Sequence, residues 1–348
     1  MRARTRGSVG AAPATVHFLL KPMNRVIGMS PPSPRMNASD TIGQPVPKPR
    51  AWAAAMRLPF TSVAVVPFGV GAWLAHAHGR MTSASATVAG LLAVFLMTIG
   101  CYLLGEAHDQ VEDVATLKYG RNKFSGGSLM VSNGSLQERQ VRLAALGSFV
   151  VALLLGLYVV VVHSAPWLLG LGVFGGIAAA FYSMPPVRLV KRGFGELFIG
   201  VCYGWLTIVT GYASASGGMP TFGHYVTLPV ALTVFNIILI NEFPDYEADR
   251  EAGKRNLLVR IGKRAGAVVY ALAMVATAAV FVVIWHAHRG GSLGHGIVAA
   301  APGAWALWLA FEVGVLRAYE DRGRLESVAA RTIVLNLASA ICVGVLVR

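Results

Sequence analysis

Long apolar runs dominate this sequence and restrict the folds open to it. Each run has 17 or more residues with very few charges, and a helix needs about 20 residues, at roughly 1.5 Å each, to cross about 30 Å of hydrocarbon. With 55% hydrophobic and only 13% charged residues, the chain is too apolar for an ordinary soluble domain. We therefore predict an all-α bundle of nine transmembrane helices, over approximately residues 58–78, 87–105, 143–162, 166–183, 194–213, 224–241, 265–287, 297–317 and 331–347.

The first 50 residues differ from the rest of the chain. They are rich in Arg, Pro, Ser and Ala, and their only apolar cluster, VHFLL, is too short to span a membrane. We expect residues 1–50 to form a disordered tail and residues 51–348 to form one membrane domain.

The positive charge follows the connectors between the apolar runs. A net charge of +14 could indicate nucleic-acid binding, but the Lys and Arg residues do not gather on one amphipathic face, so we expect no nucleic-acid partner. They are concentrated in every second connector, as the positive-inside rule predicts for cytoplasmic loops. This pattern predicts an integral membrane protein with its N-terminus and residues 105–142 and 241–264 in the cytoplasm. We expect the membrane to be a bacterial inner membrane.

An acidic motif follows directly after the apolar run that ends near residue 241. In the stretch NEFPDYEADREAGKRNL, Asn241, Asp245 and Asp249 are four residues apart and so project from one face of a helix. Hard oxygen ligands of this kind suit Mg²⁺, which usually binds one or two carboxylates together with substrate phosphates. The motif therefore predicts a magnesium site and a substrate that carries phosphate.

A second acidic motif lies upstream, in GEAHDQVED. Its residues Glu106, Asp109 and Asp113 also follow an apolar run, and Asp109 precedes Asp245 by 136 residues, which indicates an internally doubled chain. Solvated loop charges would explain one such motif. Two copies at matching spacing favour a metal site, because acidic groups beside apolar helices are costly unless they are paired.

Cations that could contact a diphosphate follow both motifs and also the predicted span 166–183. Glycines in a Ser-Gly-Gly-Ser turn would let backbone amides converge on an anion that nearby cations neutralise. Anchoring at the cytoplasmic face is the alternative interpretation of these cations. The candidates for diphosphate binding are Lys118, Arg121, Lys123, Ser125, Arg188, Lys191, Arg192, Lys254 and Arg255.

The two motifs resemble those of the UbiA superfamily of intramembrane prenyltransferases, whose usual forms are NDxxDxxxD and NxxxDxxxD. The SGGS turn and the stretch YSMPPVRLVKRG resemble the branch that prenylates 1,4-dihydroxy-2-naphthoate in menaquinone biosynthesis. The resemblance covers about residues 52–348. It implies nine helices around a central cavity, Mg²⁺ as cofactor, and transfer of a polyprenyl group from its diphosphate to an aromatic acceptor.

By this resemblance, the catalytic residues are Asp109, Asp113, Asp245 and Asp249, and Asn241 completes the metal ligands of the second motif. The first motif departs from the family, because Gly105 and Glu106 replace the usual Asn-Asp pair. A glycine allows the backbone to bend, so we expect Gly105 to let the longer acid Glu106 reach the metal. The alternative is that Glu106 is not a ligand.

Three other functions compete with this interpretation. Another acceptor, such as 4-hydroxybenzoate or a glycerol phosphate ether, would keep the same chemistry. A membrane transporter would also show internal duplication, although its charged groups would be expected near the bilayer midplane. A non-catalytic scaffold would not require two acidic motifs. The sequence indicates neither prenyl length nor oligomeric state.

Overall fold

The computed structural model describes residues 44–120, 124, 126–289 and 292–348, and no strand occurs among them. The all-α fold is thus confirmed for this part of the chain. Its α-helices are α2 (Lys48–Ala55), α3 (Ser62–Ala77), α4 (Ala84–His108), α5 (Gln110–Tyr119), α6 (Glu138–His163), α7 (Trp167–Ser183), α8 (Gly195–Gly200), α9 (Thr207–Ser216), α10 (Leu228–Glu251), α11 (Leu257–Arg289), α12 (Leu293–Gly314) and α13 (Arg322–Val347).

Short helical segments join these elements. Four are single 3₁₀ turns at connectors, and one, η3, is a π-helical segment that joins α8 to α9 within one continuous span. A π-helical segment inside an α-helix is rare and is frequently found at functional sites. The bounds are η1 (Leu58–Thr61), η2 (Leu189–Lys191), η3 (Val201–Leu206), η4 (His224–Thr227) and η5 (Ala318–Glu320).

Eight helical stretches among the described residues are long and apolar enough to cross a membrane. The remaining expected span, 166–183, forms α7, an apolar helix of 17 residues that is shorter than the other eight. A count of nine spans is therefore not confirmed, although 17 residues is about the lower limit for a spanning helix. In the expected tail, residues 1–43 lie outside the described part, and α2 begins at Lys48.

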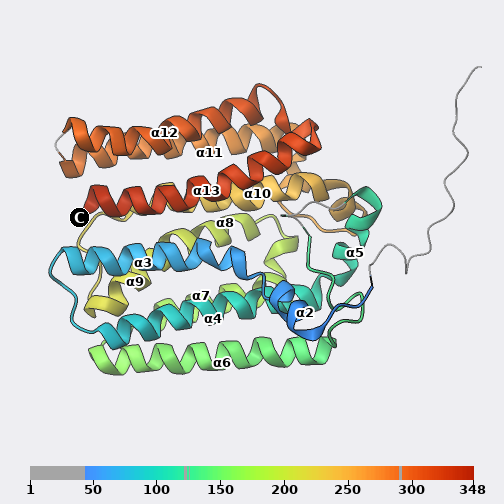
Figure 1. The fold of residues 1–348 in the computed structure, drawn as a ribbon, viewed down its shortest axis with the longest axis horizontal. Coiled ribbons are helices and arrows are strands. Elements are labelled where there is room, and N and C mark those ends of the chain that lie inside the picture. Colours follow the sequence, from blue (N-terminus) through green and yellow to red (C-terminus); the bar gives the residue numbers. More distant parts are fainter. Residues whose placement is uncertain (1–43, 121–123, 125, 290–291) are drawn as a thin grey trace, which may run out of the picture. The chain divides into compact units, whose positions relative to one another are not determined.

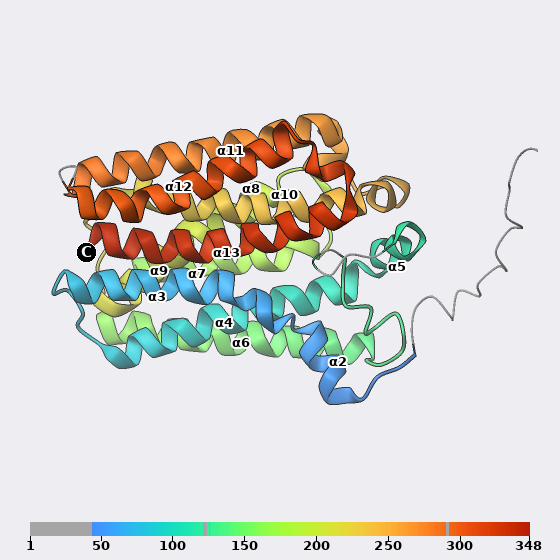
Figure 2. The same cartoon turned by 45° about the horizontal axis from the view of Figure 1, so that its top comes forward.

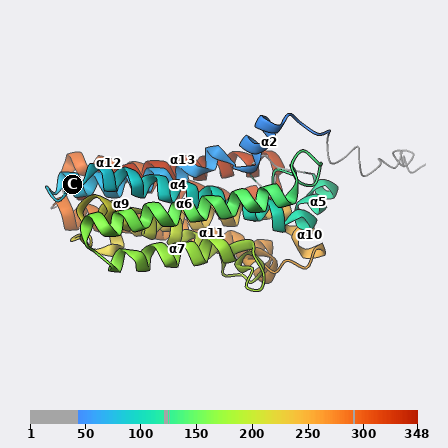
Figure 3. The ribbon, with the colours of Figure 1, turned by 90° about the horizontal axis from the view of Figure 1, so that it is seen from below.

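The long helices run side by side along one axis (Figure 1). Both acidic motifs lie at the same end of the bundle, where α5 and the C-terminal end of α10 meet, and the C-terminus of the chain lies at the opposite end (Figure 2). From below, α6 and α7 lie next to each other, and α5 is seen at the same end as in the other views (Figure 3).

Glycines allow the closest helix contacts in the bundle. A Cβ atom at Gly71 of α3 would lie 2.0 Å from the carbonyl oxygen of Ile208 in α9, and one at Gly211 of α9 would lie 2.1 Å from that of Phe68. Gly204 of η3 approaches Ala231 of α10 in the same way. Small residues at helix interfaces are typical of membrane bundles, in which close packing drives association.

We predict that the two ends of the bundle lie on opposite sides of the membrane. Gln137 lies at the end that carries the acidic motifs, and Met219 lies at the other end. Both positions are exposed, and each can be replaced by cysteine. An impermeant thiol reagent should therefore label the two variants from opposite sides of sealed vesicles. Labelling of both variants from one side would contradict this arrangement.

Candidate active site

The first acidic motif spans a bend between two helices. Helix α4 continues without a break past Gly105, and the backbone changes direction at Asp109, which has φ −105° and ψ 19° and separates α4 from α5. The bend that the sequence suggested at Gly105 is therefore located at Asp109. As a result, Asp109 lies at the junction, and Glu112 and Asp113 lie in the first turn of α5.

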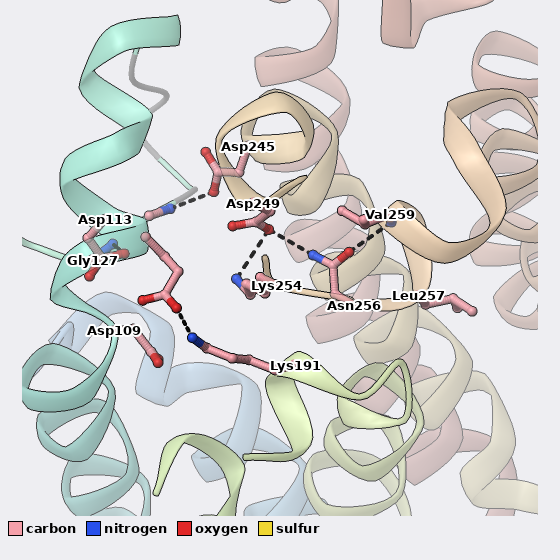
Figure 4. Close-up of polar contacts among 12 residues, drawn as sticks. Asp109, Asp113, Gly127, Lys191, Asp245, Asp249, Lys254, Asn256, Leu257 and Val259 are labelled. Carbon is pink, nitrogen blue, oxygen red and sulfur yellow. Dashed lines mark hydrogen bonds and ion pairs between the residues drawn. The ribbon is translucent and has the colours of Figure 1, made fainter. Parts of the chain in front are cut away.

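The second motif lies on α10, which packs against α5. Asn241, Asp245 and Asp249 occupy its last three turns and point from one face, as their spacing predicted. Figure 4 shows Asp109 and Asp113 on one side of the site and Asp245 and Asp249 on the other. The structure thus brings the two motifs together.

Cations from the connector between α7 and α8 contact the first motif. The Arg188 guanidinium donates to the Asp109 carboxylate at 3.0 Å and to the His108 carbonyl at 2.9 Å. Ser183 donates to the other oxygen of Asp109 at 2.8 Å. Lys191 forms an ion pair with Glu112, whose side chain is buried. Arg188 has a left-handed backbone, with φ 45°, and lies at the turn that leads into η2.

The connector between α10 and α11 folds back on the second motif. The Lys254 ammonium lies 3.2 Å from the Asp249 carboxylate, and the amide of Asn256 donates to the same oxygen at 2.7 Å. The oxygen of the Asn256 amide accepts a hydrogen bond from the backbone of Val259 at 2.9 Å and so caps the start of α11. Lys191 and Lys254 point into the space between α5 and α10 (Figure 4).

A glycine turn bridges the two motifs. The backbone amide of Gly126 donates to the Asp245 carboxylate at 2.9 Å, and the amide of Gly127 donates to the Asp113 carboxylate at 2.7 Å. Glu106 is also bonded to this connector, through Ser128, Met130 and Val131. Convergence of the turn on anions was expected, but here the anions are side chains of the protein itself.

The other candidate cations occupy different positions. Lys118 pairs with Glu251 at 2.9 Å at an exposed position. Arg192 donates to the carbonyls of Val187 and Pro186 in its own connector, and Arg255 is exposed. Arg121, Lys123 and Ser125 lie outside the described residues. Among the described candidates, Arg188, Lys191 and Lys254 are the cations that contact the acidic motifs.

Several site residues were missed by the sequence analysis. Glu112 follows Asp109 by three residues and therefore shares its helix face, so its spacing could have revealed it. Ser183 and Asn256 carried no such signal, because their roles depend on contacts between distant segments. Glu196 of α8 is also buried, and one of its oxygens accepts a hydrogen bond from the backbone amide of Leu257 at 2.8 Å.

Charge and burial perturb two groups of the site outside the spans. Burial, followed by the nearby negative charge of Asp109, raises the pKa of Asp113 to about 7, although the hydrogen bond from Gly127 opposes this shift. Burial of Lys254 disfavours its charged form, but the carboxylates of Asp249, Asp109 and Glu242 raise its pKa well above the usual value. The clustered carboxylates therefore favour a bound cation.

The donor atoms fit Mg²⁺ by their chemistry. Asp109, Asp113, Asp245 and Asp249 supply carboxylate oxygens, and the buried amide oxygen of Asn241 has no hydrogen-bond partner among the described residues. Hard oxygen atoms are the ligands that Mg²⁺ prefers. Within the described ranges, however, no group of three or more His, Cys, Asp and Glu residues is arranged to hold an ion, because each carboxylate is turned to its own cation, amide or hydroxyl.

An apolar cavity of about 450 Å³ lies beside the polar cluster. Its wall comes from α3, α4, α6, α7 and the span from α8 to α9, and includes Phe68, Met97 and Tyr203. Two lining residues connect it to the site: Tyr182 precedes the Ser183 that bonds Asp109, and Cys101 lies about two turns before Asp109 on α4. A polar headgroup and an apolar tail could thus bind side by side.

The fold and the site define a helical membrane protein with an acidic and basic cluster at one end of an apolar cavity. The UbiA prenyltransferase family model matches residues 64–333, and the chain belongs to this family. The chain is 27% identical over 196 residues to the 1,4-dihydroxy-2-naphthoate octaprenyltransferase of Bacillus subtilis, covering 56% of this chain and 62% of that protein.

A second relative has a different activity. Over 137 residues, the chain is 35% identical to the bacteriochlorophyll synthase 33 kDa chain of Cereibacter sphaeroides, covering 39% of this chain and 45% of that protein. The chain therefore spans less than two thirds of the length of either relative. Among solved structures, a UbiA homologue from Archaeoglobus fulgidus bound to DMAPP and Mg²⁺ has a TM-score of 0.56 and 14% identity, covering 82% of this chain and 98% of that one. This match confirms the fold.

We predict that Mg²⁺ stabilises the purified protein through these carboxylates. A ligand that binds only the folded state at about 100 times its Kd adds roughly 2.7 kcal/mol of stability, so the thermal midpoint should rise with Mg²⁺. The Asp249→Asn variant should lose most of this rise. Glu247→Gln, which removes a partly exposed acid two residues away on the same helix, should keep it. Equal responses in both variants would contradict the assignment.

Proposed function

We propose that this protein transfers a prenyl group from a polyprenyl diphosphate to an aromatic acceptor, with Mg²⁺ as cofactor. The observation that carries the proposal is an acidic and basic cluster at one end of a membrane bundle that also holds an apolar cavity, whose lining residue Tyr182 is next to the Ser183 that bonds Asp109. A diphosphate that carries an isoprenoid tail has this same division between a charged head and an apolar tail. Membership of the UbiA prenyltransferase family supports the proposal.

The chain's own residues would hold the diphosphate in a defined place. Lys191 and Lys254 point into the space between the motifs (Figure 4) and would attract its negative oxygens. The amides of Gly126 and Gly127 would donate to the same anion once their present partners, Asp245 and Asp113, turn to a cation. Bound Mg²⁺ would supply a Lewis acid that stabilises the diphosphate as a leaving group.

The reaction needs a dry site for its charged intermediate. Heterolysis of the allylic C–O bond leaves the electron pair on the diphosphate and an allylic cation on the prenyl group. A ring carbon of the acceptor then bonds to this cation, and the ring recovers its electron pair when that carbon loses the hydrogen or carboxylate that it carried, as a proton or as CO₂. The apolar wall around Cys101, Tyr182 and Tyr203 would keep water from the cation, and Arg188, Lys191 and Lys254 would stabilise the charge that develops on the leaving group.

We infer that 1,4-dihydroxy-2-naphthoate is the acceptor, in menaquinone biosynthesis. The similarity to the Bacillus subtilis enzyme supports this choice, as does the resemblance of the SGGS turn to the naphthoate branch. A bacteriochlorophyll precursor is the alternative that the second relative favours, and 4-hydroxybenzoate or a glycerol phosphate ether would require the same donor site. Membranes supplied with labelled polyprenyl diphosphate and each acceptor, with and without Mg²⁺, distinguish these choices. No Mg²⁺-dependent product with any of them would contradict the function.

We further propose that the end of the bundle that carries both motifs faces the cytoplasm of a bacterial cell. The basic connectors support this orientation, because arginines and lysines concentrate in cytoplasmic loops. In intact spheroplasts, an impermeant thiol reagent should label cysteine at position 219 and not at position 137. The reverse pattern would contradict the orientation.

We predict that Asp245→Asn abolishes prenyl transfer while the bundle stays folded. The change replaces a charged ligand by a neutral one and leaves the apolar spans intact, so turnover should fall by at least about 100-fold. Glu247→Gln is the matched control on the same helix and should retain activity. The measurement is prenylated product per minute from the purified parent and variant proteins. Equal thermal midpoints of these proteins would show that the variants are folded. Near-normal turnover of Asp245→Asn at saturating Mg²⁺ would contradict the metal assignment.

We also predict that the cavity limits the length of the prenyl donor. Gly176 of α7 lines the cavity, and a Cβ atom there would lie 3.6 Å from the side chain of Met97, which also lines it. The larger side chain of Gly176→Leu should fill part of this space and lower kcat/KM for long donors by about tenfold relative to short ones. Gly170→Leu, on the same helix at an exposed position with open space around it, is the control. An unchanged ratio in Gly176→Leu would exclude the cavity as the tail site.

A further inference from the structure

The carboxylate of Glu106 accepts four hydrogen bonds from the connector between α5 and α6. One oxygen accepts bonds from the backbone amide and the hydroxyl of Ser128, both at 2.8 Å. The other accepts bonds from the backbone amides of Met130 at 2.6 Å and Val131 at 3.2 Å. The side chain is buried, with 5% of its surface exposed. An ionised carboxylate has about four acceptor positions, so Glu106 uses its whole acceptor capacity on this connector.

The backbone of the connector is shaped around this carboxylate. Leu129, between the bonded residues, has a left-handed backbone with φ 64° and is itself buried. A left-handed residue in a buried connector is uncommon outside glycine and persists where surrounding contacts hold it. Here it turns the amides on both of its sides toward one anion. The four hydrogen bonds to Glu106 therefore specify the conformation of residues 128–131.

The same connector carries the glycine turn. Gly126 and Gly127 directly precede Ser128, and their amides bond Asp245 of the second motif and Asp113 of the first. A carboxylate on α4 thus fixes one end of a short segment whose other end lies between the two motifs. Loss of the Glu106 contacts would loosen the turn, because a glycine backbone is conformationally permissive and the bonds to Asp245 and Asp113 would then hold the segment at one end only.

We propose that Glu106 is a positioning residue that anchors the Gly126–Gly127 turn between the two acidic motifs, and that it is not a metal ligand. The inference rests on the proposed function, in which the turn helps to bind the diphosphate. A metal bound by Glu106 would have to replace charge-assisted hydrogen bonds that already satisfy both oxygens. Gly105 needs no compensating role, because α4 is regular there and a Cβ atom would only reach ordinary contact with Ser183, at 3.7 Å.

Glu106→Gln in the full-length protein tests the proposal. Glutamine has nearly the same size, but one of its two acceptor groups becomes a donor that faces the Ser128 or Met130 amide. Amide hydrogen exchange of residues 126–131 should become at least about tenfold faster, while the Kd for Mn²⁺, measured by electron paramagnetic resonance as a probe of the Mg²⁺ site, stays within about twofold. The KM for polyprenyl diphosphate should rise about tenfold with a smaller change in the Mg²⁺ requirement.

Asp249→Asn is the matched control, because Asp249 contacts Lys254 and Asn256 of the connector after α10. It should weaken Mn²⁺ binding and leave the exchange of residues 126–131 unchanged. Ser128→Ala, which removes a single hydroxyl from the Glu106 contacts, should fold even if Glu106→Gln does not. It should show the same pattern of faster exchange and unchanged Mn²⁺ affinity, with smaller changes.

Two results would overturn the proposal. One is a tenfold or greater loss of Mn²⁺ affinity in Glu106→Gln, as expected for a ligand. The other is unchanged exchange of residues 126–131 in both Glu106→Gln and Ser128→Ala. Neither measurement requires turnover, so Glu106 can be assigned even if the parent protein transfers no prenyl group, a result that would contradict the proposed function alone.

Discussion

Negative charge at the end of an apolar bundle is the constraint on which the structure of this site depends. Carboxylates removed from water are costly unless a cation or a hydrogen-bond donor accompanies each one. Six carboxylates of the two motifs meet this requirement: Asp109 and Glu112 with cations, Asp113 and Asp245 with glycine amides, Asp249 with Lys254 and Asn256, and Glu106 with four donors. The partners come from three different connectors, and so the charges hold these connectors against the helix ends.

These contacts explain how the connectors at this end of the bundle are held against the motifs. The connector after α7 is held by Arg188 and Lys191, the one after α10 by Lys254 and Asn256, and the one after α5 by Glu106. A substrate diphosphate with its metal would bring both negative and positive charge to the same place. The present contacts can therefore be exchanged for contacts to the substrate without leaving a charge unpaired, which is how a preorganised site lowers the cost of binding.

Among the apolar helices, small residues determine the helix packing and the shape of the cavity. Where α3 crosses α9, glycines let the backbones touch, which closes the bundle. Around the cavity, glycines on α6 and α7 leave space because no side chain fills it. The same residue type thus serves two opposite purposes, and the difference lies in whether another backbone faces the glycine. The π-helical segment η3 lies on the cavity wall and shifts the register of that span at the place where a tail would bind.

The sequence by itself determined the all-helical class, the approximate spans and the helix faces of the acidic motifs, because apolar run length and four-residue spacing are local properties. It also pointed to Arg188, Lys191 and Lys254. It could not predict which of the neighbours Lys191 and Arg192 contacts the site, because a connector lacks the regular periodicity that fixes side-chain direction in a helix. It placed Glu106 with the metal by its position in the motif and left open the alternative that Glu106 is not a ligand. Only the tertiary structure shows which partners these side chains have: Lys191 meets Glu112, Arg192 turns to its own backbone, and Glu106 meets the amides of residues 128–131, because the partner of a buried charge is set by how distant connectors fold over the helix ends.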